Sequence, residues 1–237
     1  MLGTVAVWAG ALLTLAMVVG GVLLLPLLLV WSTTAQAADM TPSTAATPPP
    51  PPAAAQRYRA QLLRAAHSQW GLDAPVAAMA AQVHQESGWN PAAVSRAGAQ
   101  GMAQFMPATA TWWCSRQASA HAAADCQPSN PTWALRALVG YDKWLWDRLP
   151  AGAAASTTAD ADRLWATLRA YNGGLGHWQA ESAHAGSTAR AAVDAACGTA
   201  RRAKLHCVEN LSYPHRIMNV LQPRYSGWGR ALWVARD

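Results

Sequence analysis

Glutamate is rare in this chain, and one of its three glutamates stands where a general acid is expected. Residues 73–87 predict a helix with Met79 and Val83 on one apolar face. Glu86 lies on the same face, in the last turn before the break at Gly88. An apolar floor and the negative end of a helix both raise the pKa of a carboxyl group. A general acid that works near neutral pH needs this property. The alternative is a side chain that points into solvent at a frayed helix end.

Two motifs follow Glu86 directly, and two shorter ones come later. The first reads Glu-Ser-Gly-Trp-Asn-Pro from Glu86 and ends at Ser95; the second reads Gly-Ala-Gln-Gly-Met-Ala-Gln-Phe-Met-Pro over residues 98–107. Ala-Tyr-Asn occupies residues 170–172, and Glu209 precedes Tyr213 by four positions. This order resembles the soluble lytic transglycosylase (SLT) family. Its pattern is E-S-x-x-N-P-x-A-x-S, G-A-x-G-L-M-Q-x-M-P, A-Y-N, and a Glu shortly before a Tyr. The resemblance covers residues 60–225.

The resemblance implies a mainly α-helical, goose-lysozyme-like fold and an enzyme that acts on peptidoglycan. The implied reaction cleaves the β-1,4 bond between N-acetylmuramic acid and N-acetylglucosamine without consuming water. Glu86 would first protonate the bridging oxygen, and would then deprotonate the C6 hydroxyl as a 1,6-anhydro ring closes. This scheme needs one carboxylate, whereas most glycosidases use two. A hydrolytic lysozyme on the same fold is the nearest alternative.

The resemblance also implies roles for other residues of the site. Glu209 is expected to be structural, because an acidic residue before a helix commonly caps it. The family's G-L-M-Q segment is Gly-Met-Ala-Gln here, and Ala97 replaces a second serine that some relatives carry. The expected substrate-binding residues are Ser95 beside Glu86, Met102 and Gln104 along the groove, Tyr171 and Asn172 in its wall, and Tyr213 at the cleft.

Helical patterns account for most of the elements that would position these residues. Apolar periodicity and start or stop signals predict helices over 54–70 and 73–87, near 107, from 130, and over 160–171 and 214–221. The sequence shows no convincing alternating strand, although residues 95–104 could form a small hairpin. The domain should therefore be mainly α.

The net charge of the chain and its lack of metal-binding motifs limit the classes of partner and cofactor that are expected. The formal net charge of +6 suits an anionic polymer such as peptidoglycan, although it could serve solubility alone. No run of Lys and Arg and no basic recognition helix is present, which argues against nucleic acid. No Cys-x-x-Cys occurs and the seven histidines are scattered, so neither a metal nor another cofactor is expected.

The amino-terminal part of the chain predicts export. Residues 1–37 carry no charged side chain, and the apolar run over 3–31 exceeds the ~20 residues that cross a bilayer. It is either a membrane anchor or a signal peptide, since Ala-Gln-Ala at 35–37 is a cleavage pattern. Both interpretations place the domain in the periplasm or on the outer face of the inner membrane. Residues 38–56 then form a Pro/Ala/Thr-rich linker, and residues 57–237 the catalytic domain.

The four cysteines of an exported domain predict two disulfides. Three pairings are possible for Cys114, Cys126, Cys197 and Cys207, and pairing of nearest neighbours would close two local loops. A Cys/His peptidase is a competing hypothesis, and it requires a free thiol. A non-enzymatic hypothesis is a membrane-tethered wall-binding or scaffold component of secretion, conjugation or phage machinery.

Overall fold

A computed structural model of the chain describes residues 47–117, 126–150 and 157–234. They belong to one compact unit, Ala46–Asp237. The segment predicted to be a signal peptide or anchor, residues 1–37, lies outside the described residues, as does the first part of the predicted linker, residues 38–46. Within the described ranges, no helix combines the length and hydropathy that a membrane crossing requires.

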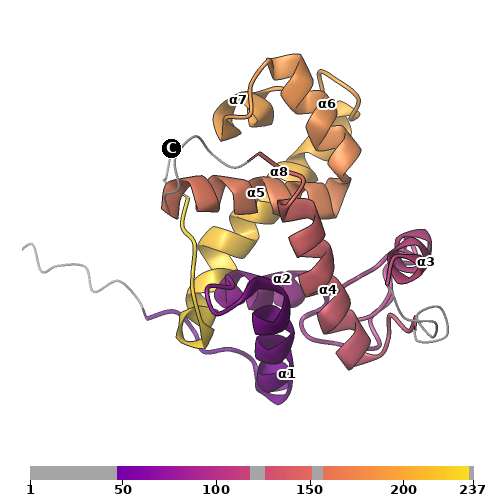
Figure 1. Cartoon of the computed structure of the whole chain (residues 1–237), viewed down its shortest axis with the longest axis vertical. Coiled ribbons are helices and arrows are strands. Elements are labelled where there is room, and N and C mark those ends of the chain that lie inside the picture. The colour runs from indigo at the N-terminus through magenta and orange to yellow at the C-terminus, as the bar shows by residue number, and fades with distance from the viewer. Residues whose placement is uncertain (1–46, 118–125, 151–156, 235–237) are drawn as a thin grey trace, which may run out of the picture. The chain divides into compact units, whose positions relative to one another are not determined.

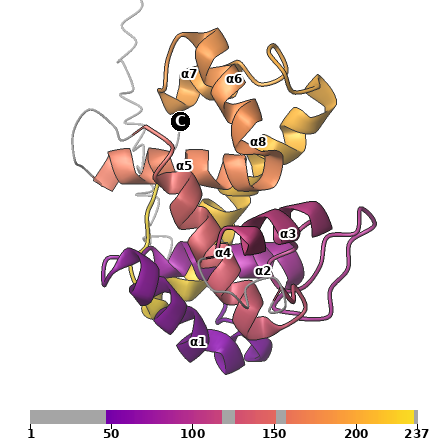
Figure 2. The same ribbon diagram turned by 45° about the vertical axis from the view of Figure 1, so that its right-hand side comes forward.

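The described residues are mainly helical, which confirms the prediction that the domain is mainly α (Figures 1 and 2). The principal elements are eight α-helices: α1 (Ala53–Trp70), α2 (Val76–Ser87), α3 (Pro107–Ser115), α4 (Pro131–Trp146), α5 (Thr157–Gly173), α6 (Leu175–Ala185), α7 (Arg190–Ala195) and α8 (Cys207–His215). Three shorter segments are η1 (Lys204–His206), a π-helical η2 (Arg216–Leu221) and a 3-10 η3 (Gln222–Trp228).

Helix α2 is the central element of the main core. All of its residues from Val76 to Val83 are buried, and it packs against α1, η2 and η3. Many of these residues are alanine, so neighbouring helices approach closely and large aromatic rings fill the remaining space. Trp89, which directly follows the end of α2, is 1% exposed and donates from its indole nitrogen to the Tyr225 hydroxyl at 2.9 Å. The core therefore surrounds the helix that carries Glu86.

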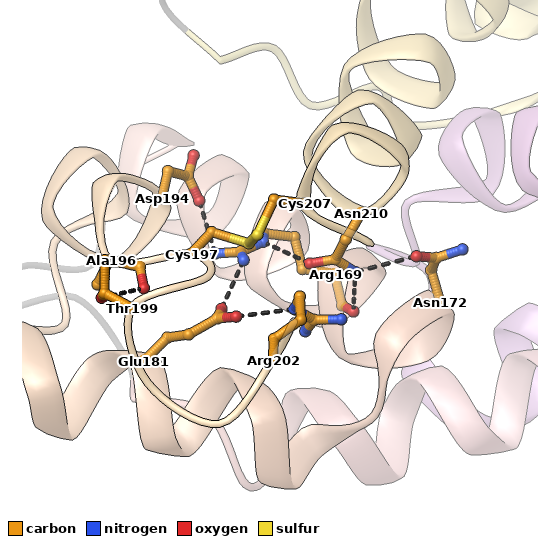
Figure 3. The surroundings of a disulfide bond; sticks show 10 residues. All are labelled: Arg169, Asn172, Glu181, Asp194, Ala196, Cys197, Thr199, Arg202, Cys207 and Asn210. Carbon is orange, nitrogen blue, oxygen red and sulfur yellow. Dashed lines mark hydrogen bonds and ion pairs between the residues drawn. A yellow bond between two sulfur atoms is a disulfide. The ribbon is translucent and has the colours of Figure 1, made fainter. Parts of the chain in front are cut away.

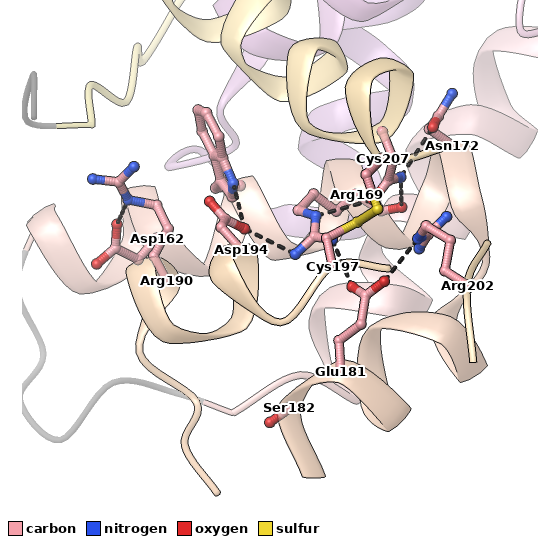
Figure 4. A network of polar contacts seen from close by, with 12 residues as sticks. Asp162, Arg169, Asn172, Glu181, Ser182, Arg190, Asp194, Cys197, Arg202 and Cys207 are labelled. Carbon is pink, nitrogen blue, oxygen red and sulfur yellow. Dashed lines mark hydrogen bonds and ion pairs between the residues drawn. A yellow bond between two sulfur atoms is a disulfide. The ribbon is translucent and has the colours of Figure 1, made fainter. Parts of the chain in front are cut away.

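A buried ionic network holds together the helices α5 to α8 (Figure 4). Arg169, in α5, is fully buried and lies 2.5 Å from Glu181 and 2.8 Å from Asp194. Its Nε donates to Asn210 Oδ1 at 3.0 Å, and Arg202 Nε donates to Glu181 Oε1 at 2.7 Å. Each buried guanidinium thereby meets at least one carboxylate, which offsets the cost of removing these charges from water.

Both disulfides join neighbouring cysteines. Cys114 is bonded to Cys126, and Cys197 is bonded to Cys207 beside the ionic network (Figure 3). In each pair the Cα atoms lie 5.9 Å apart. No cysteine has a free thiol, so the nucleophile that a Cys/His peptidase requires is missing.

The carboxyl-terminal helices differ most from the sequence-based prediction. Helix α8 begins at Cys207, and Pro214, predicted to open the last helix, lies inside its last turn. Proline removes a backbone donor and crowds the preceding turn, and the chain continues past it as the π-helical η2. Helices α6 and α7 were not predicted, because their sequences are rich in Ala, Ser, Gly and His and carry weak periodicity. In place of the hairpin, isolated bridges join Gln100 to Val94 and to Phe105.

Candidate active site

Glu86 sits in the last turn of α2 and is held there by a residue from α8. The helix ends at Gly88, whose φ of 61° and ψ of 27° are left-handed values that glycine adopts readily. The Tyr213 hydroxyl, 127 residues away in sequence, donates a hydrogen bond to Glu86 Oε1. Glu86 is half-buried and opens into a cavity. The carboxyl group is therefore fixed in one orientation yet remains accessible.

The surroundings of Glu86 raise its pKa to about 7. Burial is the main cause, because the charged form loses water, and the negative charge of Glu209 adds to the effect. The hydrogen bond from Tyr213 acts in the opposite direction, since it favours the carboxylate. Protonated and ionised forms of Glu86 are thus both populated near neutral pH, as an acid that later becomes a base requires.

The cavity beside Glu86 has a volume of about 460 Å³. Its walls come from α2, the loop before α3, and helices α3, α4, α5 and α8, so they join residues far apart in sequence. The residues that line it are Glu86, Ser95, Ala97, Ala99, Gln104, Phe105, Met106, Thr109, Tyr141, Tyr171, Asn172, Gly174 and Glu209.

The wall formed by residues 95–105 is a tight loop with its own hydrogen bonds. Ser95 Oγ accepts from the Ala99 amide at 3.0 Å, and Gln104 Nε2 donates to the Gly101 carbonyl at 2.9 Å. Gln104 has a φ of 48° and Gly101 a φ of 75°. A Cβ atom on Gly101 would lie 1.8 Å from the Pro128 carbonyl oxygen, so only glycine fits there. The loop thus presents Ser95 and Gln104 to the cavity from a constrained backbone.

The opposite wall is connected to the buried ionic network. Asn210 Nδ2 donates to Asn172 Oδ1 at 3.0 Å, and Asn172 Nδ2 in turn lies 3.4 Å from Glu209 Oε1. Asn210 is also the residue that accepts from Arg169 (Figure 3). Nearby, the Tyr171 hydroxyl donates to the Ala103 carbonyl at 2.6 Å and so ties this wall to the loop.

Three residues are placed differently from the sequence-based prediction. Met102 does not line the cavity: it is fully buried in the core, and its carbonyl accepts from Ser87 Oγ at 2.9 Å. Tyr213 is 5% exposed and contacts Glu86 rather than the open cavity. Glu209, predicted to be structural, is exposed and lines the cavity, and its carboxylate meets the Asn172 amide.

Asp142 is a buried carboxyl group near the site that the sequence-based interpretation missed. It is 1% exposed and accepts from Gln82 Nε2 at 3.3 Å, where Gln82 lies one helical turn before Glu86. Burial, together with the charge of Glu86, raises the pKa of Asp142 well above its usual value. The signal was present in the sequence: Asp142 continues the apolar stripe of Leu135 and Leu138, where an acidic residue is unexpected.

No metal centre is found in the part of the chain that the structure covers. No group of three or more His, Cys, Asp or Glu side chains is close enough to hold an ion there.

The chain is similar to known proteins in both sequence and fold. Two membrane-bound lytic murein transglycosylases F are similar over 99 residues, or 42% of this chain: that of Pasteurella multocida is 33% identical and that of Shewanella frigidimarina 34%. The matched region covers only 17% and 18% of those relatives. The lytic transglycosylase Slt of Pseudomonas aeruginosa shares the fold over 73% of this chain and 25% of its own, with a TM-score of 0.51 and 18% identity. The model of the transglycosylase SLT domain family matches residues 61–193, more than half of the chain, and the protein therefore belongs to that family.

Proposed function

We propose that this protein is a peptidoglycan lytic transglycosylase whose single acid/base is Glu86. The observation that carries the proposal is the Glu86 carboxyl itself: it is half-buried at the edge of a cavity, oriented by Tyr213, and has a pKa raised to about 7. Family membership and the lytic murein transglycosylases among its relatives support the same activity.

In the proposed reaction, protonated Glu86 donates its proton to the glycosidic oxygen between N-acetylmuramic acid and N-acetylglucosamine. The bond breaks, and the 2-acetamido group of the muramic unit stabilises the cationic C1. Ionised Glu86 then takes the proton from the C6 hydroxyl, and the C6 oxygen attacks C1 to close a 1,6-anhydro ring. The proton taken from C6 restores protonated Glu86, so the enzyme is regenerated without water.

The surrounding residues position the sugar rather than take part in proton transfer. Ser95 and Gln104 present polar atoms from the loop wall, and Tyr171 and Asn172 do so from the opposite wall. Phe105 and Tyr141 add aromatic surface, against which a sugar ring can pack. Asp142 is buried, and burial raises its pKa, which favours its neutral form.

The test is digestion of purified peptidoglycan followed by mass spectrometry of the products. We expect the wild-type chain to release anhydromuramyl ends, and Glu86→Gln to lose at least ~100-fold in rate because the proton donor is gone. Glutamine can still accept the hydrogen bond from Tyr213. Glu209→Gln is the matched control, since it makes the same chemical change in the other acid of the cavity and should keep measurable activity.

The products also separate the alternatives. A hydrolytic lysozyme would leave reducing ends, because water would then attack C1. A scaffold without catalytic activity would release neither product. Full activity of Glu86→Gln would refute the assignment of Glu86.

The compartment proposed for this reaction is the periplasm, with membrane attachment if residues 1–37 are retained. Two disulfides fit an oxidising compartment, and the similar proteins are described as membrane-bound. Fractionation of cells that produce the full chain, with protease added to spheroplasts, tests this: a protein protected by the inner membrane contradicts the proposal.

A further inference from the structure

A second hollow adjoins the cavity at Glu86. Its volume is about 330 Å³, and it is lined by Ala108, Thr109, Trp112, Tyr141, Trp144 and Leu175. Thr109 and Tyr141 also line the first cavity, so the two spaces lie side by side. A substrate that fills the catalytic cavity can therefore extend into the hollow without leaving the protein surface.

The aromatic side of the hollow carries two arginines. The Arg148 guanidinium lies 3.9 Å from the ring centre of Trp144 and is held there by a hydrogen bond of 2.9 Å to the Trp144 carbonyl. The Arg116 guanidinium lies 5.0 Å from the ring centre of Trp112 and 5.9 Å from that of Trp144. Stacking on tryptophan holds both cations at the aromatic edge.

These two cations have no acidic partner among residues 47–117, 126–150 and 157–234. Both arginines are exposed. Lys143, on the same helix as Trp144, is different, because it is paired with Asp147 at 2.6 Å. Stacking uses the flat faces of the guanidinium groups, so the in-plane N–H groups of Arg116, and those of Arg148 other than the one bonded to the Trp144 carbonyl, can meet a carboxylate.

We propose that this hollow binds the acidic stem peptide of the peptidoglycan strand, with Arg116 and Arg148 pairing its carboxylates. The inference rests on the proposed function and adds a preference for peptide-bearing over uncharged substrate. The apolar surfaces of Trp112 and Leu175 suit the aliphatic part of a short peptide, and the two guanidinium groups suit its negative charge. A neutral ligand would give neither cation a counter-charge beyond those that the described residues supply.

The test compares two forms of the same soluble glycan strands. One form carries native stem peptides; in the other, their carboxylates have been converted to amides with carbodiimide and ammonia. The strand and the peptide backbone are unchanged, and only the negative charge is removed. For the wild-type full chain we expect amidation to raise KM about 3- to 10-fold, as two exposed charge-assisted contacts would. The effect should shrink in ~0.5 M salt, because exposed charges are screened.

The decisive variant is Arg116→Gln/Arg148→Gln, which should no longer distinguish the two substrates. Arg64→Gln/Arg136→Gln is the matched control: it also removes two exposed positive charges, but away from the hollow, and should remain sensitive to amidation. The proposal is overturned if the wild-type enzyme cleaves both strands equally well, or if the Arg116/Arg148 variant keeps the full preference. Absence of anhydromuramyl products with either strand would instead contradict the proposed function.

Discussion

Two neighbouring residues act on the Glu86 carboxyl in opposite directions. Tyr213 donates a hydrogen bond that favours the ionised form, whereas the negative charge of Glu209 disfavours it. Because Glu86 must be protonated to act as an acid, kcat/KM should fall as pH rises through its pKa. The pH at which kcat/KM falls therefore measures how Tyr213 and Glu209 each change the pKa of Glu86.

Tyr213→Phe should move the alkaline fall in kcat/KM to higher pH. The phenylalanine keeps the ring but removes the hydrogen bond, so the carboxylate is less favoured and the pKa of Glu86 rises above about 7. We expect a displacement of roughly one pH unit. The measurement is the rate of release of anhydromuramyl ends from pH 5 to 9.

Glu209→Gln supplies the counterpart to Tyr213→Phe. It removes a negative charge, so the pKa of Glu86 should fall and the alkaline limb should move to lower pH. If the alkaline limb of kcat/KM moved in the same direction in both variants, this account of the pKa of Glu86 would be contradicted.

The environment of Glu86 could be predicted at this scale, but its contacts could not. Its place on an apolar face before a helix break indicated a raised pKa, and the structure shows that rise. Tyr213 and Asp142 lie 127 and 56 positions away from Glu86 along the chain. A local sequence pattern does not show which residues that far away lie close to Glu86 in the fold. Met102 was misplaced because a motif specifies residue types and not which side of a loop each faces.

At the scale of elements, the structure of the loop over residues 95–105 depends more on Gly101 than on Gly98. Gly101 and Gly98 both have positive φ, of 75° and 85°. A Cβ atom at Gly101 would collide with the Pro128 backbone, whereas nothing lies within 4 Å of one at Gly98. Alanine at Gly98 would therefore meet backbone strain alone, whereas alanine at Gly101 would meet both backbone strain and a steric collision.

Gly101→Ala should destabilise the protein by more than ~3 kcal/mol and remove most of the activity, because the loop must move away from residue 128. Gly98→Ala should cost about 1–2 kcal/mol through strain alone. Urea denaturation, with activity measured on the same samples, checks both values. Equal losses in the two variants would show that the contact with Pro128 is unimportant.

Helices with strong start and stop signals were predicted well. Asn130 precedes Pro131, and its side chain accepts from the amides of Thr132 and Trp133, as the sequence of a capped helix indicates. Helices α6 and α7 have no side-chain cap at their amino ends and are stabilised by packing and by the ionic network, which only the tertiary structure reveals.

At the scale of the whole domain, stability depends on a buried carboxylate that forms ion pairs with two arginines. Glu181 is fully buried and contacts both Arg169 and Arg202. Glu181→Ala should lower the free energy of unfolding by about 3–5 kcal/mol, because it leaves buried cations without their partner. Thermal and urea denaturation measure the loss.

Asp147→Asn is the matched control for Glu181→Ala, since it removes one acid from an exposed pair with Lys143. It should cost less than about 1 kcal/mol. A comparable loss in both variants would mean that burial of the network does not determine its contribution.

The two disulfides connect the helices that border the cavity to the chemistry of the surrounding compartment. Cys114 lies in α3, which carries Thr109, and Cys207 opens α8, which carries Glu209 and Tyr213. Each bridge covalently tethers one of these helices to a nearby loop. A reducing cytosol would keep all four thiols reduced and both tethers unformed, whereas the compartment proposed for the domain allows them to form. The alignment of the proposed proton donor with its neighbours is thereby coupled to thiol oxidation.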